Sequence, residues 1–259
     1  SLNANVLNLR KFKFTLGASV GHYANKILAL ADGDYKTSVY GAEILTAVNQ
    51  PIGQFYGYQT DGVYATTDEA LASGLSMRKP NGELIPFEAG DVRFVNNNAS
   101  DKVIDENDKV VIGNSNPDFY GAIHAGIRFM NLNLKAIFNY SYGNEVYNYL
   151  RSQLESGSTF NNQSVAITNR WITEGQKTII PNSVFGDPKG NNRFSDRWIE
   201  DGSYLRLKSL EISYELPLNV SFLQGVTVWA SANNLWTLTK YLGVDPEFAP
   251  YNQLLYQGI

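Results

Sequence analysis

The sequence contains no cysteine, and its histidines, His22 and His124, lie far apart in the chain. Without cysteine it cannot form a disulfide scaffold or a thiolate metal site, although this absence does not fix its compartment. The two histidines lack the spacing of metal ligands, so we expect them to be polar surface residues. Glycine-rich nucleotide-binding loops and the Gly-x-Ser-x-Gly nucleophile motif are also absent.

Long hydrophobic runs and a large excess of charge are missing as well. No stretch reaches the about 18 consecutive apolar residues of a transmembrane helix. The net charge of −4 offers no broad electrostatic attraction for nucleic acid. Membrane β-barrels stay open as a class, because their strands need only about 9–11 residues of alternating character. Residues 1–5 do not form a signal peptide. If the protein is exported, its signal lies upstream, so we expect this chain to be a fragment.

Alternation of apolar and polar residues with a period of two recurs along the chain. It is clearest in residues 11–20, 119–130, 132–142, 210–216 and 226–233. One face of each segment is apolar, with aromatic residues towards the ends, and the other carries Lys, Arg, Asn, Ser, Thr or Glu. The pattern predicts antiparallel β-strands with two chemically distinct faces, joined into hairpins at Asn131 and at residues 217–225.

The apolar face has two interpretations. In a soluble β-sandwich it would pack against a second sheet, and in an outer-membrane barrel it would contact lipid. Strands of about 11 residues exceed the usual length of about 5–6, which favours the barrel. Residues 59–119 and 144–204 are rich in Gly, Asn, Asp and Ser and are predicted to be long loops. Residues 164–173 predict a short helix that is capped by Ser164 and ends near Gly175.

Several motifs follow one another in a fixed order. They are FYGYQTDGVY (55–64), GDVRF (90–94), NPDFYG (116–121), YGNEVYN (142–148), FSDRW (194–198), EDGSYLRLK (200–208) and KYLGVDPE (240–247). Together they span nearly the whole chain. The set resembles the C-terminal part of SusC-like (RagA-type) TonB-dependent outer-membrane transporters.

This resemblance implies an all-β fold. Residues 1–259 would form the C-terminal portion of a large, 22-stranded type of outer-membrane β-barrel, made of antiparallel up-and-down strands. The plug domain, the early strands and the final strand would be absent, and the long extracellular loops would contain short helices. A partial barrel has open edges and an uncovered apolar face. We therefore expect the rest of the barrel to lie outside this chain, or the edges to pair with other copies.

The resemblance also implies a function in nutrient uptake rather than catalysis. The protein would import glycans, or peptides, across the outer membrane of a Gram-negative, Bacteroidetes-type bacterium. Its partners would be a SusD-like surface lipoprotein, outer-membrane lipid, and the TonB/ExbB/ExbD system through the missing N-terminal part. Loops 65–91, 149–201 and 244–257 would capture the cargo, and Tyr56, Tyr58 and Trp198 are candidate ligand-binding rings. For the rings of residues 55–64, the alternative is a strand pair with girdle or packing aromatics.

Residues 90–108 resemble the family segment that leads into a calcium-binding type of loop. The oxygen ligands of such a loop would be Asn96, Asn98, Asp101, Asp105 and Asp108. The chain departs from the pattern, because it lacks the glycine of the sharp bend and carries fewer negative charges. The alternative is a polar loop that holds its shape through its own side chains, with no cofactor.

Two rival functions follow from the composition. One is a soluble, β-rich carbohydrate-binding module, which would be monomeric without detergent. The other is a glycoside hydrolase that uses Glu200 with Asp201, or Asp105 with Glu106, as its carboxylate pair. Adjacent residues on a strand point to opposite faces, so neither pair converges unless a loop bends it.

Overall fold

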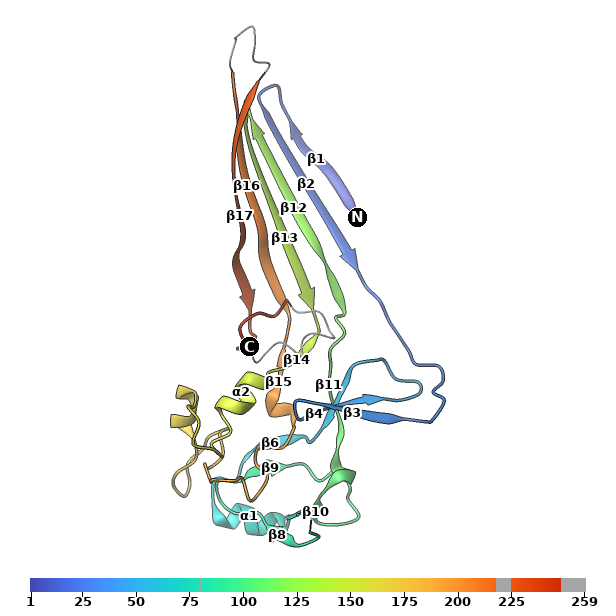
Figure 1. Cartoon of the computed structure of the whole chain (residues 1–259), viewed down its shortest axis with the longest axis vertical. Helices are drawn as coiled ribbons and strands as arrows, with labels where there is room; N and C mark the ends of the chain where they lie inside the picture. The colour runs from blue at the N-terminus through green and yellow to red at the C-terminus, as the bar shows by residue number, and fades with distance from the viewer. Residues whose placement is uncertain (80, 218–224, 248–259) are drawn as a thin grey trace. The chain divides into compact units, whose positions relative to one another are not determined.

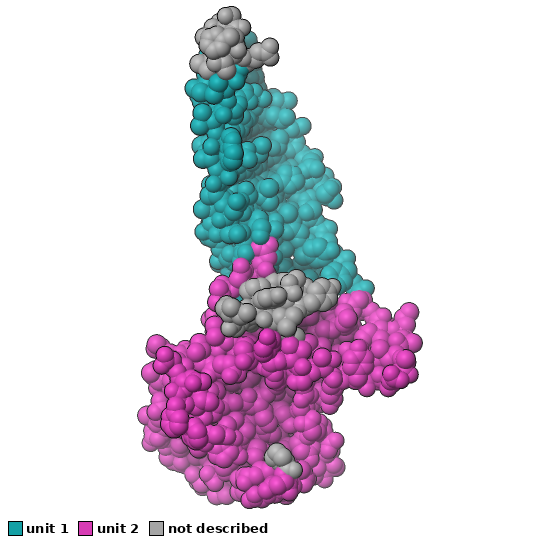
Figure 2. All heavy atoms as spheres, viewed as in Figure 1, with its two compact units in different colours: residues 1–24, 117–144, 201–241 teal, residues 25–116, 145–200, 242–259 magenta. Residues whose placement is uncertain are grey.

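The computed structural model describes residues 1–79, 81–217 and 225–247, which divide into two compact units (Figure 2). Unit 1 consists of the described parts of residues 1–24, 117–144 and 201–241, and unit 2 of those of residues 25–116, 145–200 and 242–247. Each unit combines segments that are distant in the sequence. A low-complexity linker is therefore not needed to separate them, which is why composition did not indicate the division.

Unit 1 is a single antiparallel sheet of six strands in the order β1-β2-β12-β13-β16-β17 (Figure 1). Its strands are β1 (Leu2–Asn8), β2 (Phe12–Gly21), β12 (Phe119–Phe129), β13 (Leu132–Tyr142), β16 (Tyr204–Leu216) and β17 (Val226–Thr239). The prediction of long, up-and-down antiparallel strands is confirmed. Part of the connection at residues 217–225 lies outside the described residues.

Strands β16 and β17 extend beyond the residues 210–216 and 226–233 that alternation predicted. Their registers shift where Ile137 and Phe138 pair with Ser209 and Leu207, and again between β16 and β17. Asn234, at the second irregularity, has a φ of 53°, a left-handed conformation that asparagine tolerates better than most residues. Each bulge moves the alternation by one residue, so the pattern breaks although the strand continues.

The register of the sheet aligns apolar side chains from strand to strand. One row consists of Phe14, Ile127, Leu134, Ile212 and Ala230, and the next of Leu16, Ala125, Ala136, Leu210 and Ala232. We call the side of the sheet with these rows the apolar face. The aliphatic side chains of these rows are partly or largely exposed, and on the same face Ile212 is 45% and Val228 is 59% exposed. The described residues of unit 1 form no second layer over it.

Unit 2 contains several small sheets in place of one large sheet. A four-stranded sheet has the order β11-β5-β4-β3, from Val110–Asn114, Gln54–Gly57, Ala42–Thr46 and Tyr35–Val39. A three-stranded sheet has the order β10-β7-β8, from Val103–Ile104, Ser76–Arg78 and Leu84–Pro86. The remaining pairs are β6 (Thr60–Val63) with β9 (Val92–Phe94) and β14 (Glu145–Tyr147) with β15 (Ile199–Asp201).

The helices of unit 2 are short. They are α1 (Thr67–Ser73), α2 (Tyr149–Leu154) and the 3₁₀ turns η1 (Glu106–Asp108), η2 (Val165–Asn169) and η3 (Asp196–Trp198). Helix α1 begins where the Thr66 side chain accepts a hydrogen bond from the Glu69 N–H, and it ends at Gly74, whose φ is 65°. Among the described residues, no helix has the length and apolar character needed to cross a membrane.

Two sequence predictions need correction in unit 2. The predicted helix at residues 164–173 is only the 3₁₀ turn η2, although Ser164 caps it as expected. The segment is rich in β-branched residues, and the Thr168 hydroxyl donates to the Val165 carbonyl, which competes with regular helix bonding. The predicted strand pair at residues 55–64 is in fact β5 and β6, which belong to different sheets.

Aromatic residues dominate the two hydrophobic cores of unit 2. One core contains Tyr58, Tyr64, Phe87 and Phe94, and the other contains Phe55, Tyr147 and Trp198. Both draw their members from distant parts of the chain. The long segments that read as loops therefore fold together into a packed body.

Candidate functional site

Opposite the apolar face, the sheet of unit 1 presents a polar face. Its side chains also lie in rows, of which one is Thr15, Gly126, Lys135, Glu211 and Ser231, and the next is Lys13, Arg128, Asn133, Ser213 and Trp229. The two faces follow from period-two alternation along each strand. A sheet of this kind can contact two different environments at once.

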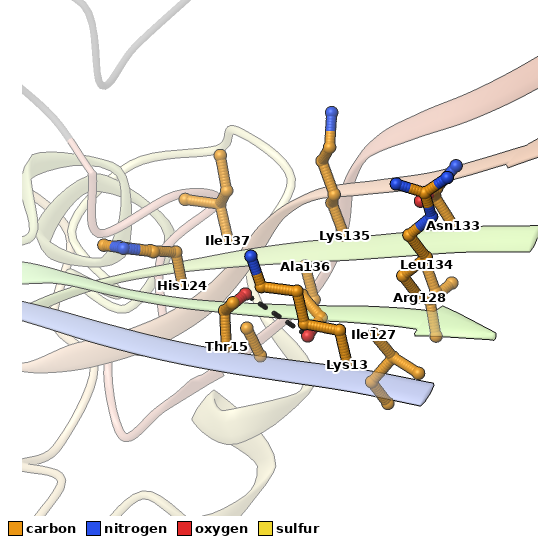
Figure 3. A pocket seen from close by; sticks show the side chains of 12 residues that line it. Lys13, Thr15, His124, Ile127, Arg128, Asn133, Leu134, Lys135, Ala136 and Ile137 are labelled. Carbon is orange, nitrogen blue, oxygen red and sulfur yellow. Dashed lines mark hydrogen bonds between the residues drawn. The ribbon is translucent and has the colours of Figure 1, made fainter. Parts of the chain in front are cut away.

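A hollow of about 450 Å³ lies on strands β2, β12 and β13. Lys13, Thr15, His124, Arg128 and Lys135 are among its lining residues. Figure 3 shows the side chains of Lys13, His124 and Lys135 on one side of the strands. The Thr15 hydroxyl donates to the Gly126 carbonyl at 3.3 Å, a contact drawn there as a dashed line. The hollow is therefore lined by several basic side chains, beside a hydroxyl and a carbonyl that bond to each other.

Some of the basic side chains that line the hollow form ion pairs, and others do not. Lys135 lies 3.3 Å from the Glu211 carboxylate, and Arg128 lies 3.8 Å from that of Glu215. Within the described part of the chain, Lys13 forms no ion pair. His124 interacts through Nε2 with the Asn3 side chain at 2.6 Å, in agreement with a polar-face residue. The sequence placed these residues on the polar face but did not show that they surround one hollow.

Two of the three predicted ligand-binding rings are buried. Trp198 is 1% exposed and Tyr58 is 4% exposed, so neither presents a ring face to a ligand in this structure. Only Tyr56 is partly exposed, and the Lys36 ammonium lies over its ring at 4.4 Å. For Tyr58, burial agrees with the packing alternative, and for both Tyr58 and Trp198 it disagrees with a ligand-stacking role.

Trp198 is the centre of a group of cations and rings. The guanidinium groups of Arg197 and Arg151 lie 4.7 Å and 5.7 Å from its ring centroid, and its indole N–H donates to the Arg193 carbonyl. Burial, together with the charge of Arg151, lowers the pKa of Arg197 to about 10. Cation–π contacts of desolvated guanidinium groups are among the stronger ones. This part of the FSDRW motif therefore stabilises unit 2.

The GDVRF motif has a similar structural role. Asp91 is fully buried; its carboxylate accepts hydrogen bonds from the Glu88 backbone N–H and the Asn191 side chain. Burial raises the pKa of the Asp91 carboxyl, and the hydrogen bond from Asn191 counteracts the rise. Gly90 has a φ of 87°, and a Cβ there would lie 2.5 Å from the Trp171 ring. Only glycine fits both requirements.

Hydrogen bonds within the predicted cation loop use the carboxylate oxygens proposed as ligands. Asp108 accepts from the backbone N–H groups of Asn98 and Asp105, Asp101 accepts from that of Val103, and Asp105 accepts from that of Asn107. Asn96 donates to the Asp101 carbonyl. In the described part of the chain, no group of three or more His, Cys, Asp or Glu side chains is placed to hold a metal ion. These bonds are the ones expected of a self-stabilised loop, and cation binding by Asn96, Asn98, Asp101, Asp105 and Asp108 stays a prediction.

The carboxylates of the proposed hydrolase pair hold the local structure. Glu200 accepts hydrogen bonds from Arg151, from the Asn148 side chain and from the Leu242 N–H. Asp201 accepts from the Ser203 N–H, and hydrogen bonding by the Ser203 side chain, followed by its N–H, lowers the pKa of the Asp201 carboxyl. Glu200 is thus occupied on both oxygens, and Asp201 forms the turn at Gly202. Glu200 therefore has no free oxygen with which to act as a general acid or nucleophile.

The predicted capture loops are distributed over unit 2. Residues 65–91 and 149–200 lie in it, as do residues 244–247, whereas 248–257 fall outside the described residues. Within the second loop, the rings of Phe160 and Phe185 stack at 4.7 Å although they are 91% and 67% exposed. Sequence analysis did not single out these rings. The only sequence signal for Phe160 and Phe185 was that each is a large apolar residue within a mostly polar segment.

Comparison with known proteins was made against families, curated sequences and solved structures. No family model matches the chain. TonB-dependent receptor P3 of Formosa agariphila is 30% identical over 260 residues, covering 95% of this chain and 24% of the receptor. The chain is thus related to the TonB-dependent receptors. Receptor P26 of the same organism is 28% identical over 261 residues, covering 95% of this chain and 25% of that receptor.

Solved structures of similar fold agree with this relationship. A structure described as the RagAB peptide transporter matches with a TM-score of 0.74 and 20% identity, covering 94% of this chain and 25% of that chain. The RagAB peptide importer in the "open-open" state matches with a TM-score of 0.71 and 22% identity, covering 94% and 25%. The chain spans about a quarter of the length of these proteins. The predicted SusC-like, RagA-type resemblance and the all-β fold are confirmed, and the relatives are named as receptors and a transporter and not as enzymes.

Proposed function

We propose that this chain is the C-terminal portion of the β-barrel of a TonB-dependent importer. It acts in the outer membrane of a Gram-negative, Bacteroidetes-type bacterium and takes up glycan or peptide oligomers. The observation that carries the proposal is the uncovered apolar face of unit 1. A soluble sandwich would bury these side chains against a second sheet, and their exposure does not agree with that alternative.

The dimensions of the sheet support a membrane location. Strand β12 has 11 residues, which at about 3.3 Å per residue gives about 36 Å. Tilted by about 40°, it covers about 28 Å along the membrane normal, close to the apolar band of about 25 Å in outer-membrane barrels. Aliphatic rows occupy the middle of the apolar face, and Phe119, Phe129, Tyr142 and Tyr214 lie towards its ends. This distribution is typical of a lipid-facing surface with aromatic girdles.

The topology supports one orientation. The insertions that build unit 2 follow Gly21, Tyr142 and Thr239, and these strand ends pair with Tyr120, Phe119 and Tyr204 at the same end of the sheet. The turn after Phe129 is short and lies at the opposite end. Outer-membrane barrels have short periplasmic turns and long extracellular loops. The segments of unit 2 are therefore the extracellular loops in this proposal.

Partners are inferred from the same assignment. Strands β1 and β17 are the edges of the described sheet, and edges in lipid need pairing, which the remaining strands of the barrel supply. A SusD-like lipoprotein covers the extracellular side, and the TonB/ExbB/ExbD system acts through the plug-bearing part of the protein. The solved neighbours are titled as a peptide transporter and importer, which supports oligomeric cargo.

Uptake in the native bacterium tests the proposal. Deletion of the gene that encodes this chain should abolish growth on, and binding of, at least one class of oligomer among a panel of glycans and peptides. Deletion of TonB should abolish growth but preserve binding at the cell surface. The full-length protein should fractionate with the outer membrane and need detergent for extraction. Extraction in buffer without detergent, or unchanged growth and binding across the panel, contradicts the importer assignment.

A further inference from the structure

Basic side chains are concentrated near the short-turn end of unit 1. A second hollow, of about 310 Å³, adjoins the first and is lined by Asn8, Leu9, Arg10, Lys11, Phe12, Lys13, Arg128 and Met130. Its lining includes four basic residues and no acidic one. Lys13 and Arg128 line both hollows. This excess of positive charge contrasts with the net charge of −4 of the whole chain.

Lys13 and Arg128 are directly opposed on neighbouring strands. The antiparallel register pairs them across β2 and β12, and like charges directly opposite one another destabilise a sheet. The nearest compensating carboxylate, Glu215, lies 3.8 Å from Arg128, and both side chains of this pair are more than half exposed. Exposed pairs of this kind contribute little. Lys13 and Arg128 thus occupy facing positions on the polar face, and the described residues compensate their charges only weakly.

A bound anion would turn this repulsion into attraction. Guanidinium groups bind carboxylates in a two-pronged geometry, and an ammonium group adds a compact positive charge beside it. The larger hollow has no Phe, Tyr or Trp in its lining, and the smaller one has only Phe12, so together they offer little ring surface for the face of a sugar. The aliphatic and backbone surface of the larger hollow, from residues such as Ile137 and Gly126, suits an extended polypeptide better.

We infer that Lys13 and Arg128 bind the carboxylates of an acidic peptide segment during import. The inference rests on the proposed function, because it assigns the polar face to the interior of the barrel. In the proposed orientation the pair lies near the periplasmic turns. The contact then selects cargo late in its passage, after capture by the extracellular loops.

Binding to the full-length receptor in detergent tests the inference with matched probes. Fluorescent hexaglutamate should bind about tenfold more tightly than hexaglutamine at low ionic strength, and salt should weaken its binding. The double variant Lys13→Glu/Arg128→Glu should weaken hexaglutamate binding at least about tenfold. Lys177→Glu makes the same charge change at an exposed residue of unit 2 and should leave the affinity unchanged.

A second readout separates a binding role from a structural one. Without peptide, Lys13→Gln should keep or raise the melting temperature, because it removes the repulsion from Arg128. The same variant should weaken hexaglutamate binding. A purely structural lysine would lower the melting temperature instead. This variant keeps the test decisive if the double charge reversal fails to fold.

Three results would overturn the inference. They are equal affinities for hexaglutamate and hexaglutamine, undiminished hexaglutamate binding by the Lys13 and Arg128 variants, and binding of an oligogalacturonate hexamer in preference to hexaglutamate. Each of them leaves the importer assignment standing as long as gene deletion still abolishes TonB-dependent growth. Loss of the importer assignment itself would appear as unchanged growth after deletion.

Discussion

The two units of this chain treat apolar side chains in opposite ways. Unit 2 packs many of its rings into two cores, where Trp198, Tyr64 and Phe94 are almost inaccessible, although Phe160 and Phe185 remain exposed. Unit 1 orders its apolar side chains in rows along one face and leaves them exposed. The first arrangement is that of a protein stabilised by its own packing in water, and the second requires an external apolar phase. One chain therefore contains parts built for two solvents.

The largest expected effect concerns burial in unit 2. Trp198→Ala should destabilise the unit by about 3–5 kcal/mol. It leaves a cavity in the core and removes the ring with which Arg151 and Arg197 form cation–π contacts. Trp229 is 66% exposed on the polar face of unit 1, and Trp229→Ala should change stability by less than about 1 kcal/mol. Urea-dependent proteolysis of the full-length receptor in detergent measures both. Similar losses for the two tryptophans would remove the contrast between the units.

A charge placed on either face of unit 1 should give the next largest effect. Ile212 lies on the apolar face, in the aliphatic row next to the end row with Phe129 and Tyr214, and Ser213, its neighbour, lies on the polar face. Ile212→Arg should cost about 1–3 kcal/mol of folding free energy in a bilayer, because the guanidinium group would face lipid one row inside the aromatic end of the face. Ser213→Arg should cost less than about 1 kcal/mol. Folding titrations into liposomes measure the difference, and equal costs would contradict the assignment of the faces.

The smallest expected effect is a pH dependence in the loop at residues 96–108. The N–H of Asn107, followed by the Arg78 guanidinium, lowers the pKa of the Asp105 carboxyl. A lowered pKa stabilises the folded loop above the carboxyl's ordinary value of 3.8, and this stabilisation is lost as the pH falls through the depressed value. Hydrogen exchange of the Asn107 amide should therefore become less protected below about pH 4.

Asp105→Asn should remove most of this acid-dependent loss of protection. Asp68→Asn, on the exposed side of α1, is the matched control and should behave like the wild type. Protection of the Asn107 amide that does not change between neutral and acidic pH would contradict the role assigned to Asp105. Both variants leave the cores of unit 2 untouched.

The same comparison shows how far the sequence predicts the structure. Alternation placed β2, β12 and β13 correctly, since each keeps one phase from end to end. It stopped short in β16 and β17, because the bulges near Lys208 and Asn234 shift the phase within a strand. Unit 2 could not be predicted in this way, since its contacts join distant segments. The hydrogen bond between Thr60 and Asp196, for example, spans 136 residues.

The candidate site was predictable in part. Alternation put Lys13, Arg128 and Lys135 on one face, but only the register showed that Lys13 and Arg128 oppose each other. The motif aromatics Tyr58 and Trp198 attracted a ligand-binding interpretation because a motif gives residue identity and not burial. In the structure they pack against Arg193 and Arg197. Motif residues in this chain therefore mark the packing of unit 2.

The central claim is that the apolar face of unit 1 contacts lipid and the polar face contacts water. The chain has no cysteine, so in a full-length receptor with any cysteines outside this chain replaced, Ile212→Cys and Ser213→Cys each place a single fluorescent label, on opposite faces of the sheet. In liposomes, a quencher carried on the lipid chains should quench the label at 212 strongly, and aqueous iodide should quench the label at 213. Equal access of iodide to both labels, or the reverse pattern, would contradict the account.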